Sequence, residues 1–133
     1  MKHVIVVEDD PHNAMLFRKV LEKRVGCTVT VTESPAELVT LARAGGVHLV
    51  IMDVSLANST WEGKQVGGVE LCHLLKNDPR TCGIPVLLAT AHAMRGDAES
   101  LIAESGADGY VSKPILDHTA FVAQATNLMK EAA

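Results

Sequence analysis

A chain of 133 residues, 47% of them hydrophobic and 21% charged, has the composition of one globular domain rather than of a disordered segment. Its net charge of −4, with lysines and arginines scattered singly, excludes a basic stripe that would grip nucleic acid. Apolar runs such as HLVIMDV are too short to span a bilayer, and the N-terminus MKHVIVVEDD lacks the layout of a signal peptide. We therefore expect a cytoplasmic protein without membrane contact. Three cysteines without a C-x-x-C pair encode neither a disulfide framework nor a zinc knuckle.

Short apolar runs rich in β-branched residues alternate with segments of helical character along the chain. The runs cover residues 3–7, 28–31, 49–53, 86–90 and 109–112. Right-handed crossovers join such strands into a parallel sheet with helices on both faces, which explains why 49–52 and 86–89 are continuously apolar. No linker or repeat interrupts the pattern, so we expect one α/β domain over residues 1–133.

Helix boundaries are also marked in the sequence. Asp10 before Pro11 is typical of a helix start, and Ser34 followed by Glu37 matches a capping box. Glycines stand where two helices are expected to end, at Gly45 and Gly106.

Polar or charged residues stand at the ends of four of the predicted strands. They are Glu8 with Asp9, Asp53, Thr90 and Lys113. Ligands of open parallel sheets bind at the carboxyl ends of the strands, near the switch point in strand order. A single aspartate after a strand is ordinary turn chemistry, whereas convergence of four strand ends indicates a functional site.

Carboxylates gathered at one edge repel one another and raise each other's pKa unless a cation offsets them. Hard oxygen ligands without nearby histidine or cysteine favour Mg²⁺ over zinc, and Mg²⁺ leaves positions for water and a phosphate oxygen. The turn after residue 7 contains no glycine, which excludes a backbone phosphate cradle. The pattern therefore predicts a metal site that a phosphoryl group completes.

The set Glu8-Asp9, Asp53, Thr90-Ala91 and the run GYVSKP at 109–114 resembles the response regulator receiver domain of two-component signalling. The resemblance covers essentially the whole chain. It implies a flavodoxin-like three-layer sandwich, with a five-stranded parallel sheet in the order 2-1-3-4-5 and five helices. Residues 1–133 would then be one receiver domain.

The resemblance also implies roles for the acidic residues. Asp53 corresponds to the phosphoacceptor, a carboxylate nucleophile that forms an acyl phosphate. Asp9 is expected to bind Mg²⁺ directly, Glu8 partly through water, and Ser55 through its backbone carbonyl, with Asp53 itself a ligand. Asp10 aligns with a helix cap, and metal contact is its alternative.

Further roles concern the switch. Lys113 is expected to pair with the phosphoacceptor and then with the phosphoryl oxygens, and in the family its peptide bond to Pro114 is cis. Thr90 is expected to donate its hydroxyl to the phosphoryl group, with Ala91 beside it. Tyr110 would then move from an outward to an inward rotamer. Plain strand and core roles are the alternatives for the threonine and the tyrosine.

Two further features each allow two interpretations. His92 falls where the family varies its autodephosphorylation rate, but it also suits an exposed loop. The segment VSLANSTWEGKQVGG after the phosphoacceptor is about seven residues longer than usual, with Ala57 where a proline is expected, and contains the only tryptophan, Trp61. Trp61 either anchors a partner or packs over the site, or the segment is a mobile exposed loop.

The resemblance predicts a phosphorylatable switch rather than a turnover enzyme. A histidine kinase or phosphotransfer protein would supply the phosphoryl group. Output would reach a downstream effector through the fourth helix, the strand 109–112 and the last helix, from a monomer or weak dimer. The alternatives are a phosphorelay intermediate and an unphosphorylated scaffold or adaptor. A dehalogenase-fold phosphatase would need an acid where Ser55 stands, and direct nucleic-acid binding is not expected.

Overall fold

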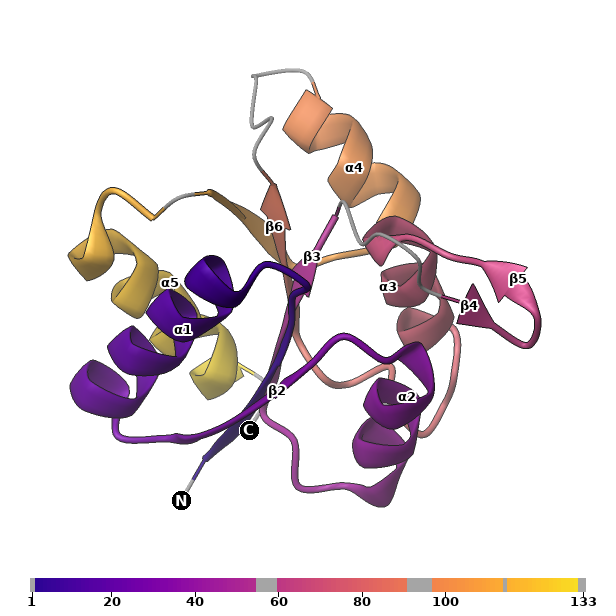
Figure 1. Ribbon diagram of the computed structural model, residues 1–133, viewed down its shortest axis with the longest axis horizontal. Helices are drawn as coiled ribbons and strands as arrows, with labels where there is room; N and C mark the ends of the chain where they lie inside the picture. The colour runs from indigo at the N-terminus through magenta and orange to yellow at the C-terminus, as the bar shows by residue number, and fades with distance from the viewer. Residues whose placement is uncertain (1, 55–59, 91–96, 114, 132–133) are drawn as a thin grey trace.

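The computed structural model describes residues 2–54, 60–90, 97–113 and 115–131. A five-stranded parallel sheet in the order β2-β1-β3-β6-β7 forms its centre (Figure 1). The strands are β1 (His3–Val7), β2 (Thr28–Thr32), β3 (Leu49–Asp53), β6 (Val86–Thr90) and β7 (Gly109–Ser112). Counted along the chain, these are strands 2-1-3-4-5, so the predicted order is confirmed. Each strand lies where the sequence predicted it, and β2 is one residue longer.

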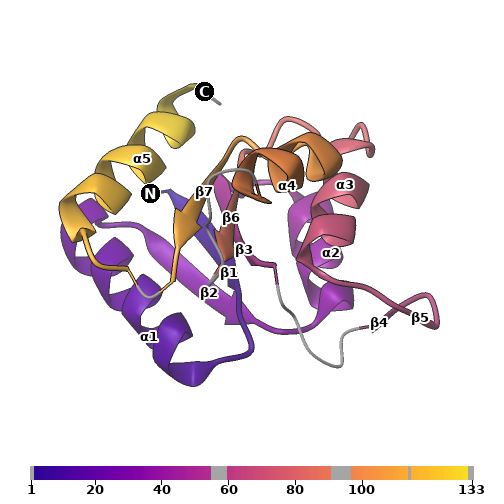
Figure 2. The same cartoon turned by 90° about the horizontal axis from the view of Figure 1, so that it is seen from above.

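Helices cover both faces of this sheet. The α-helices are α1 (Pro11–Val20), α2 (Pro35–Ala44), α3 (Gly68–Lys76), α4 (Asp97–Ser105) and α5 (His118–Glu131). Figure 2 shows α1 and α5 on one face and α2, α3 and α4 on the other. The three-layer sandwich is thereby confirmed. A π-helix, η1 (Leu21–Val25), continues α1 and ends at Gly26, whose φ of 77° suits a residue without a side chain.

The core consists of one apolar cluster on each side of the sheet. On one side the rings of Phe17 and Phe121, from α1 and α5, lie 5.5 Å apart between centroids. On the other side Leu38 and Leu71, from α2 and α3, pack against the strands. All residues of β3 and β6 are buried, as expected for central parallel strands with both faces covered.

The predicted helix N-caps are present, but the capping box at Ser34 is only half formed, because the Ser34 N–H donates to Thr32 Oγ1 and not to Glu37. The Asp10 carboxylate accepts a hydrogen bond from the His12 backbone N–H at 2.9 Å, and the Ser34 hydroxyl accepts one from the Glu37 N–H at 3.2 Å. These contacts satisfy N–H groups that have no partner within their helices. The helices therefore start directly after the strands, close to the carboxyl edge of the sheet.

The long segment after Asp53 corrects the sequence analysis, which treated it as structureless. It contains a two-stranded antiparallel hairpin, β4 (Thr60–Trp61) and β5 (Lys64–Gln65). The turn residues Glu62 and Gly63 have φ of 53° and 80°, which brings the two strands together. Figures 1 and 2 show the hairpin projecting outward past α2 and α3. Among the described residues, no helix is both long and apolar enough to cross a membrane.

Candidate functional site

Residues at four strand ends lie together at the carboxyl edge of the sheet. Glu8 directly follows β1, Asp53 ends β3, Thr90 ends β6, and Lys113 directly follows β7. The strands that carry them are parallel neighbours, since β3 lies between β1 and β6, and β7 lies beside β6. The sheet order therefore brings together residues that are up to 105 positions apart in the sequence.

Lys113 links two buried carboxylates at this edge. Its Nζ lies 2.8 Å from Asp53 Oδ1 and 3.0 Å from Glu8 Oε1. Asp53 and Glu8 are only 2% and 3% exposed, and the Lys113 side chain is 10% exposed. Charges that are buried this deeply persist in folded proteins when they are paired. The single ammonium group thus ties the ends of β1, β3 and β7 together.

Three carboxylates form the acidic group of the site. Glu8, Asp9 and Asp53 each offer an oxygen, and these oxygens lie within 4.8 Å of one another. The next acid along the chain, Asp10, caps α1 instead. A site of hard oxygen ligands with a partly open side is suited to a divalent cation such as Mg²⁺.

The electrostatics show that this group carries an excess of negative charge. The pKa of Glu8 is raised from 4.5 to about 7, chiefly by burial and then by its hydrogen bond with Asp53, against the opposing effect of Lys113. Burial alone would lower the pKa of Lys113, but its hydrogen bonds to Asp53 and Glu8 outweigh this and leave the pKa raised. One lysine therefore stays charged without neutralising its surroundings, and a bound cation would complete the charge balance.

The end of β3 is held in place by the start of α3. The Gly68 N–H donates to the Val54 carbonyl at 3.3 Å, and a Cβ on Gly68 would lie 2.0 Å from the carbonyl oxygen of Asp53. Only glycine permits so close an approach. The sequence analysis did not single out Gly68, although the Gly-Gly pair before an apolar helical run was the available signal.

Thr90 and Tyr110 lie on adjacent strands beside the acidic group. Thr90 is 2% exposed, and its carbonyl accepts a hydrogen bond from the Lys113 N–H at 2.9 Å. Tyr110 is 37% exposed, and its carbonyl accepts one from Gln124 Nε2 at 2.9 Å. The threonine is therefore inside the site region, whereas the tyrosine lies on the outer part of β7.

Several predicted residues fall outside the described residues. They are Ser55, Ala91, His92 and Pro114. Trp61 lies on β4, is half-buried, and does not belong to the acidic group. Trp61 thus lies on a hairpin, and its role as a partner anchor or as a cover over the site stays a prediction.

Comparison with known proteins gives consistent matches. The family model of the response regulator receiver domain matches residues 4–125. The chain is 39% identical over 114 residues to the polar-differentiation response regulator DivK of Brucella ovis, which covers 86% of this chain and 85% of that protein. DivK of Brucella anthropi is 38% identical over the same length.

Solved structures agree on the fold. A putative response regulator from Chloroflexus aurantiacus is 25% identical, with a TM-score of 0.83, and covers 97% of this chain and 98% of its own. The receiver domain of a sensor histidine kinase from Pseudomonas aeruginosa, which has a magnesium ion coordinated in its active site cleft, is 20% identical with a TM-score of 0.80. That structure covers 97% of this chain and 98% of its own, and at this identity it supports the fold.

Proposed function

The chain belongs to the response regulator receiver family of two-component signalling switches, and on this premise we propose that Asp53 is its phosphoacceptor. The observation that carries the proposal is the buried Asp53 carboxylate, bonded to Lys113 Nζ at 2.8 Å within an acidic group. A carboxylate oxygen attacks phosphorus, and the bond from phosphorus to the donor's histidine nitrogen breaks. The product is an acyl phosphate on Asp53 and a free imidazole on the donor.

Mg²⁺ is the cofactor that we propose for this site. Glu8, Asp9 and Asp53 supply carboxylate oxygens, and the family pattern adds the backbone carbonyl of Ser55. The fit is supported by the charge count, because three carboxylates face one ammonium group and the pKa of Glu8 is raised to about 7. When bound, the metal neutralises charge on the phosphoryl oxygens.

The remaining residues act on the phosphorylated state. Lys113, which already contacts Asp53, follows the charge to the phosphoryl oxygens and stabilises them. Thr90 donates its hydroxyl to the same group, with Ala91 beside it, and Tyr110 moves inward from its exposed position. New contacts to the phosphoryl dianion thus favour one of two packings of this edge of the molecule over the other.

Two assignments rest on the family pattern alone. The peptide bond between Lys113 and Pro114 is cis in the family, and His92 stands at a position that tunes the lifetime of the acyl phosphate. We retain both as proposals for this chain.

A histidine kinase or a phosphotransfer protein supplies the phosphoryl group in this proposal, and a downstream effector binds the face of α4, β7 and α5. The working unit is a cytoplasmic receiver domain over residues 1–133, as a monomer or weak dimer, without direct nucleic-acid or membrane contact. It is a self-modifying switch rather than a turnover enzyme. Return of the phosphoryl group to a phosphotransfer protein would assign it to a relay, and failure to accept one would leave a scaffold.

The test is intact mass spectrometry after incubation with acetyl phosphate, with and without Mg²⁺. We expect a Mg²⁺-dependent gain of one phosphoryl group that Asp53→Asn and Asp9→Asn abolish. Asp10→Asn is the matched control, because asparagine also caps helices and Asp10 lies outside the acidic group. A gain that survives in Asp53→Asn would overturn the assignment.

A further inference from the structure

The β4–β5 hairpin is not used by the proposed chemistry. Its two strands pair in register, Thr60 with Gln65 and Trp61 with Lys64. It contacts α2 through β4 and projects past α2 and α3 (Figures 1 and 2). The segment is thus an ordered protrusion rather than a structureless connection.

The tip of this hairpin is built with an unfavourable residue. Both central turn residues have positive φ, 53° at Glu62 and 80° at Gly63. Turns of this geometry favour glycine, asparagine and aspartate at both positions, because a longer side chain is crowded there. A glutamate in this conformation lowers the stability of the hairpin, and strain of this kind is retained where the side chain has a use.

The side chains of the hairpin have the composition of a protein contact surface. Trp61 is half-buried, while Glu62, Lys64 and Gln65 are exposed. Trp61 and Lys64 are directly opposite in the register, so their side chains leave the same face of the hairpin. A partly exposed tryptophan beside charges of both signs is typical of an interface anchor with its polar rim.

The hairpin is connected firmly to the phosphoacceptor strand. Only Val66 and Gly67 separate β5 from Gly68, which packs against the Asp53 carbonyl. The Gly67 N–H donates to Glu70 Oε2 at 3.1 Å, and the Gly68 N–H donates to the Val54 carbonyl. A protein that brings a phosphohistidine to Asp53 must cover this edge of the sheet, and the hairpin lies on its flank.

We propose that Trp61, Glu62 and Lys64 form a docking surface for the protein that carries the phosphohistidine. This proposal rests on the proposed role of Asp53. The partner is a protein donor rather than a small one, since Trp61, Glu62 and Lys64 lie outside the acidic group where a small phosphodonor would react. The hairpin therefore contributes to donor choice and not to the chemistry at the carboxylate.

The test compares two phosphodonors on the same variants. The histidine kinases and phosphotransfer proteins of the source organism are purified and phosphorylated, and the one that transfers fastest to the wild type is used alongside acetyl phosphate. Trp61→Ala is expected to lower kcat/KM for the protein donor about tenfold. Glu62→Asn is expected to lower it about threefold while raising the thermal midpoint, because asparagine tolerates positive φ. Labelling by acetyl phosphate should remain within twofold of wild type for both.

The control is Lys23→Gln, which removes an exposed charge on η1 and should change neither rate. Unchanged transfer in both hairpin variants would overturn the proposal. An equal loss with both donors would overturn it as well, because the hairpin would then support the site itself. Loss confined to self-association, measured by sedimentation, would assign the surface to a second copy. A wild type that accepts a phosphoryl group from neither donor would instead refute the role of Asp53.

Discussion

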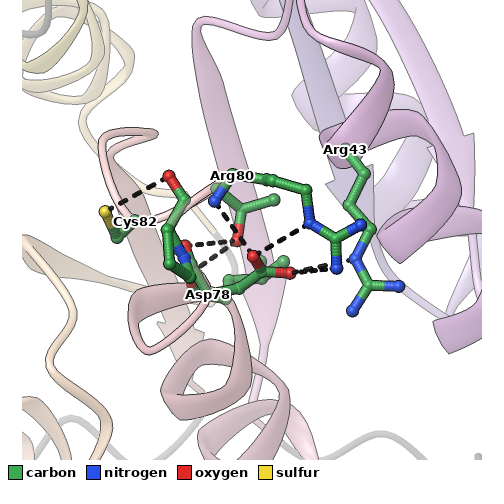
Figure 3. A network of polar contacts seen from close by, with 7 residues as sticks. Arg43, Asp78, Arg80 and Cys82 are labelled. Atoms are coloured by element: carbon green, nitrogen blue, oxygen red, sulfur yellow. Dashed lines mark hydrogen bonds and ion pairs between the residues drawn. The ribbon is translucent and has the colours of Figure 1, made fainter.

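Two clusters of charged side chains in this protein use the same residue types in opposite balance. At the carboxyl edge, Glu8 and Asp53 share one lysine and are buried. In the loop between α3 and β6, Asp78 alone accepts from two arginines, Arg43 at 2.9 Å and Arg80 at 3.2 Å (Figure 3). In the first cluster one lysine does not offset the carboxylates, whereas in the second two arginines fully offset the single carboxylate.

The pKa values report this difference. Burial raises the pKa of Glu8 to about 7. The backbone N–H of Arg80 is the main cause that lowers the pKa of Asp78 to about 2, and the side chains of Arg43 and Arg80 add to it. The cluster around Asp78 holds α2 against the loop after α3, and its negative charge is already offset by the two arginines. The cluster at the carboxyl edge is balanced only when a cation or proton joins it, which is the property of a binding site.

The largest effect is expected from the glycine that positions the carboxyl edge. In Gly68→Ala the new Cβ would lie 2.0 Å from the Asp53 carbonyl oxygen, so the backbone must shift. We expect a loss of about 3 kcal/mol or more in the free energy of unfolding, together with slower phosphorylation. Gly83→Ala, in the loop that holds Asp78, is the matched control, because nothing lies within 4 Å of its Cβ position. Equal losses in the free energy of unfolding of the two variants, measured by urea denaturation, would contradict this prediction.

The next effect concerns the one ammonium group. Lys113→Met leaves the Glu8 and Asp53 carboxylates buried without their cation. At pH 8 we expect a loss of about 3 kcal/mol in the free energy of unfolding, since breaking a buried pair is far more costly than breaking an exposed one. At pH 5 the loss should shrink, because Glu8 is then protonated. A loss that is the same at both pH values would show that charge is not the cause.

The pH dependence of stability should separate the two clusters. Because folding raises the pKa of Glu8 from 4.5 to about 7, its contribution is fully present below 4.5 and disappears as pH rises through 7. We expect the metal-free protein to lose about 1–3 kcal/mol over this interval. Glu8→Gln should remove that slope, and Mg²⁺ should restore stability to the wild type at pH 8. A wild-type curve that is flat from pH 4.5 to 7 would contradict the assignment.

The smallest effect is expected at Asp78. Because folding lowers its pKa from 3.8 to about 2, its contribution is present above 3.8 and is lost as pH falls toward 2. Asp78→Asn should reduce this loss of stability at acidic pH. The response of stability to Mg²⁺ should be the same as in the wild type. Thermal unfolding followed between pH 2 and 5 tests the prediction, and a response to Mg²⁺ that differs between the variant and the wild type would contradict the comparison.

The carboxyl edge could be predicted because the sequence shows where each buried strand ends. Buried parallel strands read as continuous apolar runs, and their order places Glu8, Asp53 and Lys113 at one edge. The pairing of Arg43 with Asp78 was not predictable in this way, because it joins a helix and a loop 35 residues apart through flexible side chains. The hairpin at 60–65 was missed because Glu-Gly is a weaker turn signal than Asn-Gly. The π-helix after Val20 has no local sequence signature of its own.

The most direct test of the central claim is to locate the phosphoryl group. Protein labelled with acetyl phosphate and Mg²⁺ is reduced with borohydride, which converts an aspartyl phosphate to homoserine, and the digest is sequenced by mass spectrometry. We expect homoserine at position 53 and unmodified Asp9 and Asp10. Modification at either of those two positions, or at a hydroxyl side chain with Asp53 intact, would contradict it.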